Sequence, residues 1–299
     1  SRRQRQMCIR DRHRPCLRHI KSGKLLKQDN MKRVLKVYRA ERFSPNSVDK
    51  DRAIIDATGL LLSERGFTVT GTDENDLDKS SEADIYLTMS RSSEALEILK
   101  KKEAEGRLII NSPDGIKACK RSTIDRLMRD NGIHAAPKTG ESGYWLKRGD
   151  ESAQGKDDVI FAANKSDKEN ALRRFASRGI TDIVVTAHVL GDVVKFYGVA
   201  GTGFFRTFYA DDAKFSKFGD EAINGIPNHY SFQVGDLQRD AEHLANLAGV
   251  AVYGGDCIVR EDGSFAIIDF NDWPSFARCR EEAAEAITLK VKQLINDKV

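Results

Sequence analysis

The chain has 299 residues, of which 40% are hydrophobic and 31% are charged, so it is long enough for two ordinary globular domains. No apolar run approaches the roughly 20 residues that a membrane-spanning helix needs, which excludes that class of protein. The formal charge of +4 lies at the N-terminal end, and the residues after position 30 carry a net charge of −4. A nucleic-acid-binding surface is therefore not expected in the body of the chain.

Residues 1–30 differ from the rest of the chain. They hold ten Lys and Arg residues against two Asp residues, and they lack both a long apolar core and a cleavage site. The run Ser1–Arg12 resembles a translated adapter sequence, whereas Met31–Tyr38 has the pattern of a normal start that enters a strand. We therefore predict that residues 1–30 are a disordered, non-native tail and exclude them from fold reasoning. A basic arm that binds nucleic acid is the alternative.

Residues 31–114 alternate predicted strands and predicted helices. Two amphipathic helices are predicted at Asp51–Arg65 and Ser93–Ala104, each followed by a Gly residue. Short apolar strands are predicted at Met31–Arg39, Phe67–Thr70, Ala83–Met89 and Arg107–Asn111. Repeated βα units predict a small parallel sheet. No glycine-rich fingerprint follows the first strand, which argues against classical dinucleotide binding by this domain.

Residues 115–299 are predicted to form a second domain, with subdomains of about 115–188 and 189–299. The turn formers Asn111–Gly115 mark the boundary. Helices are predicted at Ile116–Asn131, Lys165–Ser177, Asp236–Ala248 and Glu281–Asn296, and strands at Tyr144–Lys147, Asp158–Ala163, Asp182–Val189, Asp192–Gly198 and Gly203–Ala210. Two long polar loops, Arg148–Lys156 and Asp211–Val234, are more than plain connectors and are predicted to close over substrates.

A hairpin near the C-terminus concentrates oxygen ligands. The pair Asp262-Gly263 between two short apolar strands predicts a two-residue turn. Asp256 then faces Asp269 directly, and the two carboxylates repel each other unless a cation lies between them. Asn271 lies two residues further on and points to the same face. Such oxygen ligands suit Mg²⁺, although a one-residue slip in register would leave a solvated strand end without a metal.

Several basic residues lie where phosphates would need them. Lys147 ends a strand just before the Arg148–Lys156 loop, a good place for a point charge on phosphate groups. Gly149–Gly155 is a weak signal for a loop that closes over phosphates with its backbone N–H groups. Lys195 and Arg206 alternate with apolar residues on neighbouring strands, so each faces either a substrate anion or solvent.

The order of these features resembles the ATP-grasp superfamily. A small α/β domain is followed by a helix with a basic residue, a strand ending in Lys, a hinge strand and a closing Asp-x-Asn before a Pro. The closing run Asp269–Phe276 is similar to the ending of D-alanine–D-alanine ligases, glutamate-adding ligases and inositol polyphosphate kinases of this fold. Gly191–Val199 is similar to the region of the hinge and the following strand in the glutamate-adding ligases and the inositol polyphosphate kinases. From Met31 onward, the chain looks most similar to a bacterial group of ATP-grasp proteins.

The resemblance implies an α/β (α+β) ATP-grasp fold with a small N-terminal parallel-sheet domain, and it implies binding of ATP and Mg²⁺. By resemblance, phosphates are contacted by Arg121 (or Lys120) and Lys147, and the adenine is lined by the backbone of Thr186, Ala187, His188 and Val189. The resemblance also implies that Mg²⁺ is held by Asp256, Asp269 and Asn271. The reacting phosphoryl group or the acceptor would be faced by Lys195 and Arg206. The chain departs from its relatives at two points. Thr186-Ala187 replaces a frequent Gln-Glu at the hinge, and Ser275 replaces a common Gly.

These observations favour an ATP- and Mg²⁺-dependent ligase that activates a small-molecule carboxylate as an acyl phosphate for attack by an amine or similar nucleophile. One alternative is a small-molecule kinase of the inositol polyphosphate kinase type, against which the net charge of −4 argues. Another is a non-catalytic nucleotide-binding protein, which the Thr186-Ala187 hinge would support. Cys119, Cys257 and Cys279 show no paired spacing and indicate reduced thiols, so a cytoplasmic protein is expected.

Overall fold

The computed structural model describes residues 32–44, 48–150, 155–210 and 223–297. The predicted tail at residues 1–30 lies outside these ranges, as do parts of both predicted closing loops, at 151–154 and 211–222. The helices are α1 (Val48–Glu64), α2 (Ser93–Ala104), α3 (Pro113–Ala118), α4 (Arg121–Asp130), α5 (Lys165–Ser177), α6 (Val234–Ala248) and α7 (Arg280–Asn296), with short 3₁₀ turns η1 (Glu41–Phe43) and η2 (Lys156–Asp158). The strands are β1 (Arg33–Tyr38), β2 (Thr68–Asp73), β3 (Ile85–Thr88), β4 (Leu108–Ile110), β5 (Tyr144–Arg148), β6 (Val159–Ala162), β7 (Ile183–Ala187), β8 (Asp192–Val199), β9 (Phe204–Tyr209), β10 (Val252–Val259) and β11 (Phe265–Asp272).

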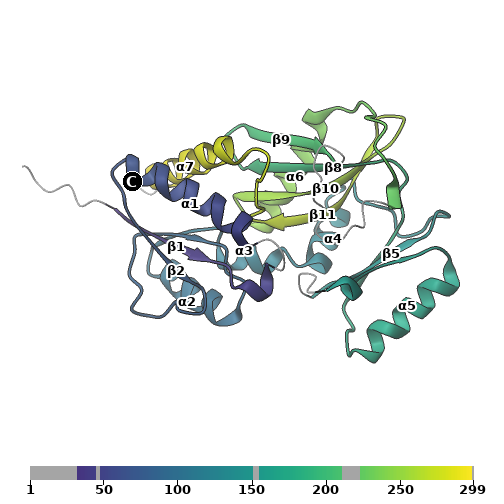
Figure 1. The fold of residues 1–299 in the computed structure, drawn as a ribbon, viewed down its shortest axis with the longest axis horizontal. Coiled ribbons are helices and arrows are strands. Elements are labelled where there is room, and N and C mark those ends of the chain that lie inside the picture. The colour runs from purple at the N-terminus through teal and green to yellow at the C-terminus, as the bar shows by residue number, and fades with distance from the viewer. Residues whose placement is uncertain (1–31, 45–47, 151–154, 211–222, 298–299) are drawn as a thin grey trace, which may run out of the picture. The chain divides into compact units, whose positions relative to one another are not determined.

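The N-terminal sheet is parallel, as predicted. Its order is β2-β1-β3-β4, and each neighbouring pair runs in the same direction. Because side chains alternate along a strand, the two faces bury different helices. Val34 and Ile85 pack with α1 and the C-terminal helix α7, whereas Leu35 and Tyr86 pack with α2. Figure 1 shows α1 and α7 on one side of β1 and α2 on the other.

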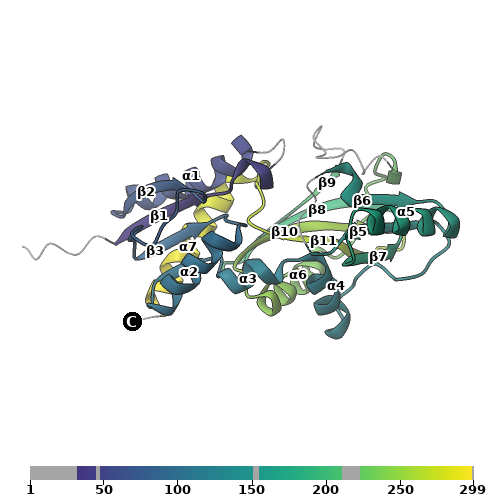
Figure 2. The ribbon, with the colours of Figure 1, turned by 90° about the horizontal axis from the view of Figure 1, so that it is seen from below.

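Two antiparallel sheets follow. The four-stranded sheet has the order β11-β10-β8-β9, and the three-stranded sheet has the order β6-β5-β7. Helix α6 buries Leu237 and Leu244 against one face of the larger sheet, and α5 buries Phe175 against Leu146 on the smaller one. Figure 2 shows α6 beneath β10 and β11, and α5 against β5 and β6. The opposite face of the larger sheet is covered at one end by α7, which packs with Val199, Phe204 and Val252.

The predicted boundary near residue 114 is crossed by buried contacts. One apolar cluster contains Val34 and Ile54 from the N-terminal sheet layer together with Val252 and Ile287. The side chain of Asn111 also bonds to the start of β10, donating to the Val252 carbonyl over 2.8 Å and accepting from the Val252 N–H over 2.9 Å. Within the described ranges, no helix combines the length and the apolar character that crossing a membrane requires.

The prediction of one helix over Ile116–Asn131 is wrong. The chain breaks between α3 and α4, where Lys120 takes an extended conformation with φ −62° and ψ 138°. Ser122 hydrogen-bonds through its hydroxyl to Asp182, over 2.8 Å, and through its N–H to Gly149 O, over 3.3 Å. These tertiary contacts set a new direction for α4. The break makes Arg121 the first residue of α4.

Candidate active site

The two carboxylates predicted to face each other do so. Asp256 on β10 is the partner of Asp269 on β11, so both side chains lie on the face of the sheet opposite α6. The side chain of Asn271 follows on the same face, and its Nδ2 atom lies 3.2 Å from Asp269 Oδ2. Two carboxylates and an amide oxygen therefore converge at one end of the hairpin.

The turn that joins these strands differs from the prediction. It has three residues rather than two: Arg260 donates its N–H to Ser264 O over 2.9 Å, and Gly263 has a φ of +79°. This turn shifts the register by one residue. Ile268 then bulges out of the ladder, which returns Asp256 to a position opposite Asp269. The predicted turn is wrong, whereas the predicted pairing of the carboxylates is confirmed.

Each carboxylate is matched by a cation. Lys195 on β8 is the cross-strand partner of Asp256, and its Nζ atom lies 3.0 Å from Asp256 Oδ1. Arg121 at the start of α4 places Nε 3.5 Å from Asp269 Oδ1. All four side chains are between 17% and 27% exposed, so the pairs are partly screened but not fully solvated. Lys120, the alternative to Arg121 as a phosphate contact, is exposed. Of these two residues, Arg121 is therefore the one beside Asp269.

These charges determine the protonation of Asp269. Burial raises the pKa of this carboxyl, but the positive charges of Arg121, Lys147 and Lys195 and the hydrogen bond from Asn271 together lower it more. The pKa of Asp269 therefore lies below its ordinary value of 3.8. The carboxyl is therefore ionised at neutral pH, which is the form that binding of a divalent cation would require.

A cavity that opens to solvent lies between the two antiparallel sheets and α4. Arg121, Lys147 and Asp269 lie at its polar part. The remaining lining residues are mostly apolar and come from α4, the segment that follows it, β7 and β11: Ile124, Asp125, Met128, Ala136, Val184, Thr186, Ile267, Ile268 and Phe270. An apolar pocket with a few convergent charges is the usual form of a small-molecule site.

No protein-family model matches the sequence, and no curated protein matches it either. Solved structures do match. D-alanine–D-alanine ligase from Bacillus anthracis, complexed with ATP, has a TM-score of 0.62 at 10% identity, covering 88% of this chain and 99% of that chain. D-alanyl-alanine synthetase A from Vibrio cholerae has a TM-score of 0.63 at 11% identity, covering 89% and 99%. The chain has the ATP-grasp fold. At this level of identity the likeness concerns the fold, and the side chains must be judged individually.

The proposed hinge of this ATP-grasp fold meets the cavity at one residue. Thr186 lines the cavity, on the same face of the sheet as Lys147. The N–H groups of Ala187 and His188 are already bonded to Pro137 O, over 2.6 Å, and to Gly143 O, over 2.8 Å. Ala187, His188 and Val189 do not line the cavity. Their backbone contact with adenine stays a prediction.

The two residues predicted to be catalytic have different surroundings. Lys195 lies directly beside Asp256, in the row of side chains that also contains Asp269. Arg206 lies on the same sheet face, across from Tyr197, but it forms an ion pair with Glu282 near the start of α7. About half of the Arg206 side chain is exposed. The structure therefore brings Lys195, and not Arg206, into contact with the predicted metal ligands.

A metal ion at this hairpin would have a sparse protein shell. Among the described residues, no group of three or more His, Cys, Asp and Glu side chains is suited to a metal ion. Asp256 and Asp269 would be joined by the amide oxygen of Asn271. Mg²⁺ accepts such a shell because it keeps several waters and uses one or two carboxylates together with substrate phosphates. The donor set therefore fits Mg²⁺ bound with a nucleotide.

Proposed function

We propose that the chain is an ATP- and Mg²⁺-dependent ligase that activates a carboxylate as an acyl phosphate for attack by an amine or a similar nucleophile. The observation that carries the proposal is the convergence of Arg121, Lys147 and Asp269 on one cavity of an ATP-grasp fold, with Asp256 and Lys195 alongside. The ligases that match the fold support the reaction class.

The residues fit a mechanism that depends on position and charge. Lys147 and Arg121 would hold phosphate oxygens, and Asp256, Asp269 and Asn271 would hold Mg²⁺, which supplies charge neutralisation when bound. Lys195 would neutralise charge on the transferred phosphoryl group. Such a reaction requires no covalent enzyme nucleophile, because the reacting groups are held in line within a dry site. The apolar lining of the cavity would help to exclude water from a reactive acyl phosphate.

The test is release of ADP over pooled amino acids, small carboxylates and inositol phosphates, with hydroxylamine added to a parallel set. An acyl phosphate reacts with hydroxylamine to give a hydroxamate, whereas a phosphorylated polyol does not. A hydroxamate that requires a carboxylate supports the ligase. ADP release with inositol phosphate alone, without hydroxamate, would replace the ligase with a kinase.

A third outcome is also informative. A nucleotide-induced rise in melting temperature without turnover on any pool would indicate a nucleotide-binding protein that is not an enzyme. Asp269→Asn is the matched variant for every assay, because it removes a proposed metal ligand while preserving the size of the side chain. The ligase proposal predicts that this variant loses ADP release under all conditions.

A further inference from the structure

The last residue of β11 points away from the site. Asp272 follows Asn271 directly, so its side chain projects from the opposite face of the strand. The Asp272 side chain is 0% exposed, and its Oδ1 atom lies 2.6 Å from Nη2 of Arg91. Neither carboxylate oxygen of Asp272 accepts a hydrogen bond from another described residue. Arg91 precedes α2, in the N-terminal layer of the protein.

Arg91 is one of the charged residues that surround the buried Arg39, together with Asp51, Glu74 and Asp272. Glu74 accepts a hydrogen bond from the backbone N–H of Arg91 over 2.8 Å, which fixes the chain at this point. Arg39, at the end of β1, forms an ion pair with Asp51 over 3.0 Å and reaches the carbonyl of Trp273 over 3.4 Å. Two arginines of the N-terminal layer therefore hold consecutive residues just beyond the proposed metal ligands.

Stability alone is a poor explanation for this cluster. Removing two charges from water offsets most of their attraction, so a buried ion pair is seldom more stable than apolar residues of the same volume. What a buried pair does provide is a fixed geometry. Asn271 and Asp272 share one peptide unit, so a rotation of the strand end moves both side chains together.

We propose that Arg91 is a positioning residue for the metal site: by holding Asp272, it fixes the rotation of the end of β11 and thereby the placement of Asn271 and Asp269. This inference rests on the proposed function, because it assumes that those two residues bind Mg²⁺ with a nucleotide. Arg91 acts on both through its ion pair with Asp272. It acts from the N-terminal layer on a strand of the ATP-grasp sheet.

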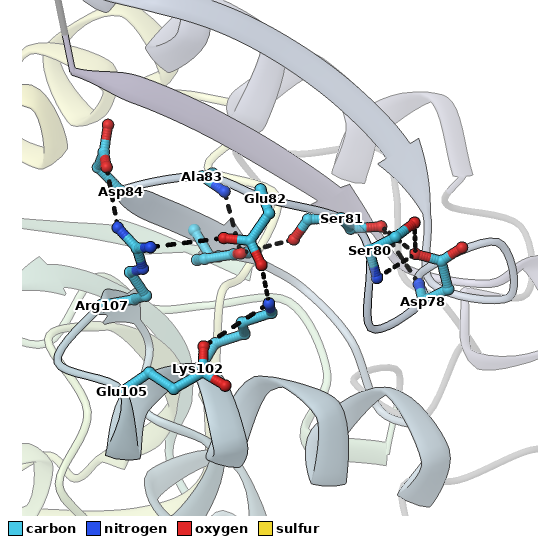
Figure 3. Close-up of polar contacts among 10 residues, drawn as sticks. Asp78, Ser80, Ser81, Glu82, Ala83, Asp84, Lys102, Glu105 and Arg107 are labelled. Atoms are coloured by element: carbon cyan, nitrogen blue, oxygen red, sulfur yellow. Dashed lines mark hydrogen bonds and ion pairs between the residues drawn. The ribbon is translucent and has the colours of Figure 1, made fainter. Parts of the chain in front are cut away.

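The same helix offers a matched control at its other end. Lys102, in the last turn of α2, is a buried cation that forms an ion pair with Glu82 and lies 3.7 Å from Glu105. Figure 3 shows this cluster, with Arg107 bridging Glu82 and Asp84. Neither Glu82 nor Glu105, with which Lys102 forms its ion pairs, lies on β10 or β11. Lys102→Met therefore removes a buried cation from α2 without disturbing the proposed metal ligands.

The experiment titrates Mg²⁺ against the full chain in the presence of saturating adenylyl imidodiphosphate, an ATP analogue that is not hydrolysed, and follows the rise in melting temperature. Arg91→Met and Lys102→Met are both expected to lower the melting temperature without ligand. Only Arg91→Met is expected to raise the Mg²⁺ concentration at half-maximal shift, by tenfold or more. Arg91→Lys keeps the positive charge, so its Mg²⁺ concentration at half-maximal shift should lie between those of the wild type and Arg91→Met. Because it keeps the charge, Arg91→Lys is also expected to fold if Arg91→Met does not.

The inference is overturned if Arg91→Met has the same Mg²⁺ concentration at half-maximal shift as the wild type, and Arg91 is then a structural residue only. If Arg91→Met does not fold, the same comparison is made with Arg91→Lys. An equal shift of the midpoint in Lys102→Met overturns it as well, because the effect would then follow from general destabilisation. Failure of the proposed function looks different: the wild type itself would show no nucleotide-induced shift at any Mg²⁺ concentration, and both ideas would fall.

Discussion

Lys147 reaches from β5 to β11 and donates a hydrogen bond from Nζ to the backbone carbonyl of Ile268 over 2.8 Å. Ile268 is the residue that bulges out of the β10–β11 ladder. A bulged residue is left unpaired by the neighbouring strand, so its carbonyl can accept the lysine. The bulge therefore has two effects: it keeps Asp256 opposite Asp269, and it holds a phosphate-binding candidate beside them.

Replacing Lys147 with Met is expected to weaken binding of the Mg²⁺–nucleotide. The loss should be roughly 10- to 100-fold, because a hydrogen bond that involves a charged group contributes about 1.5–3 kcal/mol. Met preserves the apolar stem, so the fold should remain. Isothermal titration with a non-hydrolysable ATP analogue measures the effect. Lys165→Met, on the exposed start of α5, is the control and should bind normally. Equal affinities of the two variants would contradict a phosphate contact by Lys147.

Periodicity predicted most of the fold because the signals are local. The helix over Ser93–Ala104 has its predicted bounds, and the repeated βα units gave the parallel sheet. The break at Lys120 could not be predicted in this way. No Gly or Pro marks it, and it depends on contacts between Ser122 and Asp182, which are 60 residues apart.

The pairing of Asp256 with Asp269 was predicted correctly because two errors in the strand register cancel: the turn is one residue longer than predicted, and the bulge at Ile268 was not predicted. A two-residue turn would place Asp256 opposite Asp269, and so does a three-residue turn followed by a bulge at Ile268. The sequence shows a Gly in the turn but carries no clear mark of the bulge. The apolar lining of the cavity, such as Met128 and Val184, was missed because such residues look the same in any helix or strand core.

Asp269→Asn should destabilise the protein in the absence of ligand. The hairpin alone predicts the opposite sign, because opposed carboxylates repel each other by up to roughly 1 kcal/mol. In the structure, however, Asp256 is paired with Lys195 and Asp269 with Arg121, so the substitution removes an attractive partner. The expected loss in the free energy of unfolding at pH 7 is up to about 1 kcal/mol.

The pH dependence of this difference follows from the lowered pKa of Asp269. A carboxyl with a depressed pKa stabilises the folded state above its ordinary pKa of 3.8, and the contribution disappears as pH falls through the folded value. The difference between wild type and Asp269→Asn should therefore be constant from about pH 7 to pH 5 and shrink below about pH 4. Urea unfolding across this range measures it. A more stable Asp269→Asn at pH 7 would show that repulsion between the carboxylates dominates.

The turn of the hairpin can be tested separately from its chemistry. Gly263 has a φ of +79°, and a Cβ atom there would lie 3.1 Å from Ser231 O. Gly263→Ala should lower the free energy of unfolding by roughly 1–2 kcal/mol, because the left-handed region is unfavourable for other residues. Gly235→Ala, near the start of α6 with nothing within 4 Å of the added atom, should instead raise it by roughly 0.5–1 kcal/mol. Denaturant unfolding compares them, and a neutral Gly263→Ala would contradict the three-residue turn.

His188, at the end of the proposed hinge, should make stability depend on pH. The residue is 8% exposed, and Trp145 donates its Nε1–H to His188 Nδ1 over 3.1 Å. Burial lowers the pKa of His188 below its ordinary value of 6.5. Between the lowered value and 6.5 the unfolded chain binds more protons, so the free energy of unfolding rises with pH through this window and is flat above it. Protonation would also remove the acceptor that Trp145 uses.

Replacing His188 with Phe should remove this contribution. The slope of the free energy of unfolding below pH 6.5 should become shallower in the variant, by up to about 1.4 kcal/mol per pH unit, the limit for one proton. Loss of the Trp145 hydrogen bond adds an offset that does not change with pH above 6.5. Guanidinium unfolding between about pH 5 and pH 7.5, followed by circular dichroism, measures both quantities. His243→Phe, at an exposed position of α6, is the control for histidine removal. If wild type and His188→Phe share the same slope, His188 already titrates in the folded protein as it does in the unfolded chain, and its ring is not held neutral against Trp145.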